Sequence, residues 1–124
     1  MKKLKRPFII DVEASGFGPD SYPIEVGLAL ESGMRYCRLI SPCGHWTHWD
    51  RAAEQVHGIS RQMLAQNGYP VCQIALDLNR ILGQATVYSD GWSVDKPWMT
   101  RLFHEAGMVR SFSISPLERI LSPE

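Results

Sequence analysis

Two carboxylates, Asp11 and Glu13, follow a short apolar run with one residue between them. In a β-strand, residues two apart project from the same face, so these side chains would lie together. Ligands of open α/β sheets bind outside the carboxyl ends of strands. Neighbouring carboxylates repel each other, and Mg²⁺ or Mn²⁺, which prefer oxygen ligands, would remove that conflict. The pair predicts half of a metal site, although Asp-Val-Glu alone more often marks only a strand's exit into solvent.

A third carboxylate, Asp95, comes shortly after the apolar segment 86–89, which reads as another strand. We expect it at the same edge of the sheet, at the start of a helix, where it could equally serve to stabilise the helix N-terminus. Ala14, Ser15 and Gly16 directly follow the first pair and predict a tight turn that a substrate backbone could approach.

The elements that must position these residues follow from hydrophobic periodicity and turn residues. We expect strands at 7–13, 24–30, 34–40, 86–89 and 109–114, and a loop at 43–55. Helices are expected at 61–66, 71–82 and 95–106, with a final helical turn or two at 116–121. Hairpins between the early strands must be antiparallel, and strand-helix-strand crossovers should be parallel. The fold class is therefore α/β with a five-stranded mixed sheet flanked by helices.

These motifs resemble the DEDD-type 3′–5′ exonucleases, the family of polymerase proofreading subunits, RNase T and oligoribonuclease. Residues 11–16 (DVEASG) are similar to the family's first motif, residues 54–60 (EQVHGIS) to its V-H-G-I segment, and residues 89–95 (SDGWSVD) to its second motif. The resemblance covers residues 7 to about 121. It implies a ribonuclease-H-like fold and a 3′–5′ exonuclease that hydrolyses phosphodiester bonds at the 3′ end of single-stranded DNA or RNA with two Mg²⁺ or Mn²⁺ ions.

The resemblance also implies roles for individual residues. Asp11, Glu13 and Asp95 would be the catalytic residues and the metal ligands. Residues expected to contact the nucleic acid, Phe17 and Trp92 by base stacking, are Ala14, Ser15, Gly16, Phe17, His57 and Trp92. A packing role is an equal alternative for His57, and His45 and His48 are expected to be loop residues rather than metal ligands.

The sequence also departs from the family. Asp90 and Gly91 stand where the family has His and Asn, and the late H-x-A-x-x-D motif that supplies the general base is not found. Glu118 is poorly placed to replace it. We therefore expect a single exonuclease-like domain over residues 1–124 that is C-terminally incomplete, with weak metal binding and little turnover. The alternatives are a catalytically inactive module that binds nucleic acid or protein, and an unrelated α/β domain.

Composition limits the other classes of function. The 13 Lys and Arg residues balance 13 Asp and Glu residues, so no broad basic surface is expected and bound metal or a local patch must neutralise phosphates. Three cysteines without C-x-x-C spacing argue against a disulfide framework or a zinc site. The apolar run at 8–10 is too short for a signal peptide or a membrane span, which leaves a cytoplasmic protein as the expectation. A missing C-terminal helix would expose apolar surface and favour self-association, for example as a homodimer.

Overall fold

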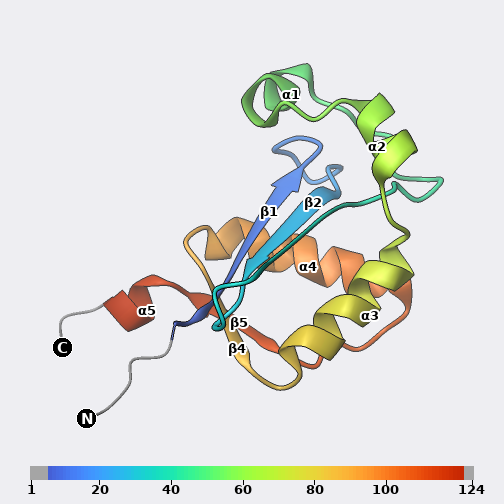
Figure 1. The fold of residues 1–124 in the computed structure, drawn as a ribbon. Helices are drawn as coiled ribbons and strands as arrows, with labels where there is room; N and C mark the ends of the chain where they lie inside the picture. The colour runs from blue at the N-terminus through green and yellow to red at the C-terminus, as the bar shows by residue number, and fades with distance from the viewer. Residues whose placement is uncertain (1–5, 122–124) are drawn as a thin grey trace, which may run out of the picture.

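The computed structural model describes residues 6–121. Its centre is a five-stranded mixed sheet with the strand order β3-β2-β1-β4-β5 (Figure 1). The strands are β1 (Phe8–Ala14), β2 (Pro23–Ala29), β3 (Arg35–Leu39), β4 (Thr86–Ser89) and β5 (Ser113–Pro116). The pairs β1–β2 and β2–β3 are antiparallel, whereas β1–β4 and β4–β5 are parallel. The predicted α/β class and mixed sheet are confirmed.

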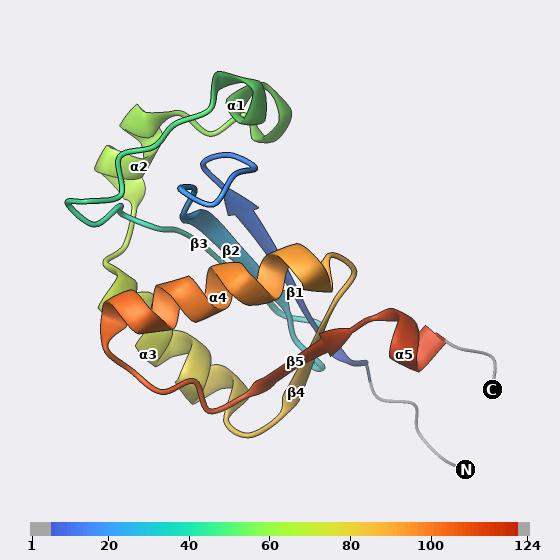
Figure 2. The same cartoon turned by 180° about the vertical axis from the view of Figure 1, so that it is seen from behind.

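Five helices accompany the sheet: α1 (Arg51–His57), α2 (Arg61–Asn67), α3 (Val71–Leu82), α4 (Trp92–Ala106) and α5 (Glu118–Leu121). Helices α3 and α4 pack against each other on one face of the sheet (Figure 2). The core lies between them and the sheet, where Ile10 and Val12 of β1 meet the buried faces of both helices, represented by Leu78 and Leu102. No described helix is long and apolar enough to cross a membrane.

The alternation of β1 decides which side chains face the helices. Ile10 and Val12 are buried, whereas Ile9, Asp11 and Glu13 project from the opposite face. In Figures 1 and 2 no described helix lies across that opposite face. Asp11 is therefore exposed and Glu13 only partly buried, while both remain anchored by a strand in the middle of the sheet.

Three boundaries differ from those expected. Residues 51–57 form helix α1, although 43–55 was predicted to be loop. The Asp50 side chain caps α1 by accepting from the Ala52 N–H at 2.9 Å, and Gly58 ends the helix at a positive φ of 73°. Strand β5 pairs at Ser113–Pro116 rather than within 109–114.

Helix α4 begins three residues earlier than predicted, at Trp92, so Asp95 lies within its first turn rather than at its first residue. Pro97 consequently lies within the helix rather than in its first turn. Its missing N–H leaves the carbonyl of Ser93 without a helical partner, and the exposed position of Ser93 lets water take that place.

Candidate metal centre

Three aspartates meet at the carboxyl end of the parallel pair β1–β4. They are Asp11 on β1, Asp90 directly after β4 and Asp95 in the first turns of α4. One carboxylate oxygen from each lies within 4.8 Å of the other two. Because β1 and β4 run side by side in the same direction, Asp11 in the middle of β1 lies beside Asp90 at the end of β4, and the helix that follows β4 returns Asp95 to the same place.

Glu13 lies on the same face of β1 as Asp11, as the spacing predicts, but it is not a member of this group of three. Its partner across the β1–β2 pair is Glu25. Burial raises the pKa of Glu13, and the neighbouring carboxylates of Asp11 and Glu25 raise it further. Glu13 thus extends the negative charge of the cluster along the exposed face of the sheet.

Asp95 is the most buried of the three, with 4% of its surface exposed. Its Oδ2 accepts a hydrogen bond of 2.6 Å from the Ser89 hydroxyl, which in turn accepts from the Gly91 N–H at 3.0 Å. Burial raises the pKa of Asp95 to about 6. The nearby carboxylates, Asp11 first, also raise this pKa, while the Ser89 hydrogen bond opposes the shift.

The donor set fits a hard divalent cation. All three ligating groups are carboxylates, the oxygen ligands that Mg²⁺ and Mn²⁺ prefer. The raised pKa of Asp95 shows that its charge lacks full compensation from the residues around it. A bound cation would supply that compensation.

Asp90 is the residue that the sequence reasoning missed as a candidate ligand. It was noted only as a departure from the His of the family's second motif. A usable signal was present: like Asp11, it is an acidic residue at the carboxyl end of an apolar strand. Its significance depends on β4 lying next to β1, which a single sequence does not state.

The turn after β1 is held by Ser15 and Gly16. Ser15 is fully buried, and its hydroxyl accepts from the Tyr22 N–H at 3.1 Å. Its carbonyl accepts from the Asp50 N–H at 2.9 Å, which ties the turn to the start of α1. A Cβ at Gly16 would lie 2.8 Å from His48 Cε1, so glycine permits this close approach. Both residues therefore shape the turn.

The remaining predicted substrate-contact residues differ in exposure. Ala14 is partly buried at the end of β1, next to a break in the strand register, and Phe17 is 75% exposed. Trp92 is 36% exposed, and its Nε1 donates to the Ile114 carbonyl at 3.0 Å. Trp92 thus joins the start of α4 to β5 and still presents part of its ring.

His57 is the last residue of α1. Its Nδ1 accepts from the Ile59 N–H at 2.9 Å, and its ring packs edge-on against Trp49 at 6.0 Å between centroids. Burial lowers the pKa of His57, which favours the neutral ring. In this arrangement His57 stabilises the turn that follows α1.

Solved structures of exonuclease I share this fold. A complex of exonuclease I with the inhibitor BCBP superposes with a TM-score of 0.76 at 14% identity over 97% of this chain and 30% of that one. E. coli exonuclease I bound to a dT13 oligonucleotide gives 0.74 at 13% identity over 92% and 28%. The zinc-bound complex of E. coli ExoI with single-stranded DNA gives 0.75 at 14% over 92% and 28%.

The present chain thus spans less than a third of the length of these neighbours. No family model matches the sequence, and no curated protein sequence matches it. At this level of identity the likeness concerns the fold, and it confirms the predicted ribonuclease-H-like architecture with a five-stranded mixed sheet.

Proposed function

We propose that this chain is a divalent-metal-dependent 3′–5′ exonuclease domain that acts on the 3′ ends of single-stranded DNA or RNA. The observation that carries the proposal is the convergence of Asp11, Asp90 and Asp95 within 4.8 Å, where β4 ends beside β1. It is supported by the exonuclease I fold, because one structure with that fold is bound to a single-stranded oligonucleotide.

In this proposal Asp11 and Asp95 are metal ligands and catalytic residues, as the sequence predicts, and Asp90 joins them. Two ions are expected in a complete site, and Glu13 would bind one of them from the outer side of the cluster. When bound, such ions lower the pKa of a coordinated water and stabilise the charge that develops on the phosphodiester. Ser89 orients the Asp95 carboxylate through its hydrogen bond.

The nucleic acid would approach across the turn after β1. In this proposal the backbone of Ala14, Ser15 and Gly16 forms the wall nearest to the cluster. Phe17 and Trp92, which are both partly or largely exposed, are available to stack against bases. His57 would support this wall from α1 rather than contact the reacting phosphate.

The test is an exonuclease assay on 5′-labelled single-stranded DNA and RNA oligonucleotides with Mn²⁺ or Mg²⁺. We expect slow, metal-dependent shortening from the 3′ end, which Asp11→Asn and Asp95→Asn abolish. Glu31→Gln is the matched control, because Glu31 is an exposed carboxylate in the turn between β2 and β3. Equal shortening in EDTA, or by the Asp11→Asn variant, would overturn the proposal.

A second candidate is a non-catalytic module that binds a nucleic-acid 3′ end or a protein at the carboxylate cluster and the turn after β1. One observation favours it. Among residues 6–121, no histidine belongs to the carboxylate group, so the group lacks a histidine that could act as general base for the attacking water. Metal-dependent binding of an oligonucleotide without any shortening over prolonged incubation would select this candidate.

A further inference from the structure

The outward side of α4 carries one continuous stripe of side chains. Residues spaced three or four apart on a helix share a face, and this face presents Trp92, Lys96, Pro97, Thr100, Arg101 and His104. Together with Ser93 they line an open groove of about 640 Å³, here called the α4 groove. None of these residues was assigned a role by the sequence except Trp92.

The α4 groove is continuous with the carboxylate cluster at one end. Trp92 and Ser93 also line a neighbouring cavity of about 360 Å³, whose wall includes Ser89 and Asp90. Asp90 is one of the three clustered aspartates. The α4 groove and the candidate metal centre therefore adjoin the same cavity.

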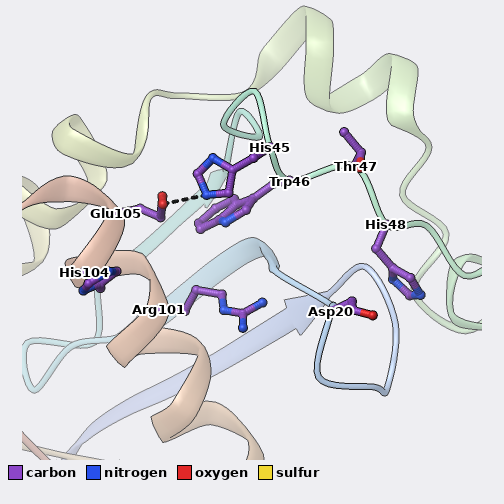
Figure 3. A pocket seen from close by; sticks show the side chains of 8 residues that line it. All are labelled: Asp20, His45, Trp46, Thr47, His48, Arg101, His104 and Glu105. Atoms are coloured by element: carbon purple, nitrogen blue, oxygen red, sulfur yellow. Dashed lines mark ion pairs between the residues drawn. The ribbon is translucent and has the colours of Figure 1, made fainter.

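At the other end, the α4 groove opens into a third cavity of about 550 Å³. Arg101 and His104 belong to both. Figure 3 shows Arg101 pointing from α4 toward Asp20, with the loop that carries His45 and His48 on the other side of the cavity. The three cavities thus share lining residues and follow one another along α4.

The charge of these cavities changes along α4. The lining of the α4 groove itself carries Lys96 and Arg101 and no carboxylate. The cavities at its two ends include carboxylates, Asp90 and Glu118 on one side and Asp20 and Glu105 on the other. Within residues 6–121 the one ion pair is His45 with Glu105, at 2.7 Å, so Lys96 and Arg101 have no carboxylate partner there. Arg101 donates to the Ser21 carbonyl, and the Lys96 Nζ lies 5.1 Å from the centre of the Trp92 ring. These contacts position both cations without neutralising them.

We propose that the α4 groove binds the sugar-phosphate backbone of a single-stranded nucleic acid upstream of its 3′ end. This inference rests on the proposed function of the carboxylate cluster. Unpaired cations beside an aromatic ring are the features that track a single strand, because the cations bind phosphates and the ring stacks on a base of any kind. A chain of zero net charge needs such a local patch to hold nucleic acid.

The length of the groove sets the length of strand it holds. Nine residues separate Asp95 from His104, which corresponds to a rise of about 14 Å along the helix. At about 3.4 Å per stacked nucleotide this is room for about four nucleotides. Oligonucleotides longer than this should therefore bind through the groove, whereas a dinucleotide should reach only the metal centre.

The test is fluorescence anisotropy with labelled dT8 and dT2 in buffer with Ca²⁺, as a function of salt. We expect Lys96→Gln to weaken dT8 binding several-fold and to lower the slope of log K against log salt by about 0.7, the value for one phosphate contact on a single strand. Thr100→Glu, which places a negative charge on an exposed residue of the groove, should weaken dT8 binding further. Lys96→Arg should bind like the unmodified chain, and dT2 binding should not change in any variant.

Arg80→Gln is the matched control, because Arg80 is an exposed cation on α3 outside the α4 groove. The inference is overturned if Lys96→Gln and Thr100→Glu bind dT8 with unchanged affinity, or if Arg80→Gln weakens binding equally. A salt-independent dT8 affinity would also overturn it, because binding through phosphate contacts must weaken as salt is added. Because this readout is binding, it stays informative if the chain fails to hydrolyse nucleic acid.

Discussion

Replacing Asp95 with Asn should stabilise the metal-free protein at neutral pH. Asn keeps the shape of the side chain and an oxygen that can accept from the Ser89 hydroxyl, but it removes the charge of a buried residue, of which 4% is exposed. Burial and the neighbouring carboxylates raise the pKa of Asp95 from 3.8 to about 6. Ionisation of this carboxylate is therefore less favourable in the folded protein than in the unfolded chain.

The sign and size of the effect follow from linkage. Between pH 4 and pH 6 the folded state binds more protons at Asp95 than the unfolded state does, so stability falls as the pH rises through this window. Above pH 6 the full penalty applies, and the difference between 3.8 and about 6 corresponds to at most about 3 kcal/mol. The variant avoids that penalty at pH 7.5 and gains nothing at pH 4.

The assay is urea denaturation in EDTA at pH 7.5 and pH 4, with Glu31→Gln as the control. We expect Asp95→Asn to be about 1–3 kcal/mol more stable than the unmodified protein at pH 7.5 and equal to it at pH 4. Adding Mn²⁺ should reverse the order at pH 7.5, because ligand binding stabilises only the protein that retains the site. A variant that is less stable at pH 7.5 in EDTA would refute the reasoning, since Asp95 would then be compensated without metal.

Three further outcomes are expected. Ser89→Ala removes the hydrogen bond that lowers the pKa of Asp95, so protons should compete more strongly with Mn²⁺ for this carboxylate. Mn²⁺ affinity measured by calorimetry should therefore fall at pH 6 and recover at pH 8. An equal loss of affinity at both pH values would contradict this. Gly16→Ala should cost about 1–3 kcal/mol in urea denaturation, because its Cβ would meet the His48 ring at 2.8 Å, whereas Gly18→Ala, which meets nothing within 4 Å, should change little; equal effects would count against the close approach. The exposed apolar side chains near the C-terminal end of the described chain, Val109, Ile120 and Leu121, should promote self-association, which light scattering at high protein concentration would reveal and which a clean monomer would disprove.

Local sequence patterns predict much of the fold. The alternation in β1 and the helical stripe of α3 with Gly83 behind it depend on residues close in sequence, and both are confirmed. The elements that were displaced or missed depend on longer contacts. The register of strand β5 is set by the pairing of Ser113 with Thr86. The residues of a strand do not by themselves specify which strand it pairs with.

The same distinction applies to the candidate site. Asp11 and Asp95 could be singled out because each stands at the end of a predictable strand or the start of a predictable helix. Asp90 carries a similar local signal, an acidic residue directly after an apolar strand, but its relevance depends on the parallel pairing of β4 with β1. Ser15 was expected to contact substrate, and only the structure places its hydroxyl against the Tyr22 backbone, seven residues away.

The central claim is that Asp11, Asp90 and Asp95 together form a divalent-metal site. Its most direct test is a Mn²⁺ titration at pH 7.5, followed by isothermal calorimetry and by the electron paramagnetic resonance signal of free Mn²⁺. We predict saturable binding that is lost in Asp11→Asn, Asp90→Asn and Asp95→Asn and unchanged in Glu31→Gln. If no Mn²⁺ binds, or if the three aspartate variants bind it as the unmodified protein does, the cluster is not a metal site and the proposed exonuclease function fails with it.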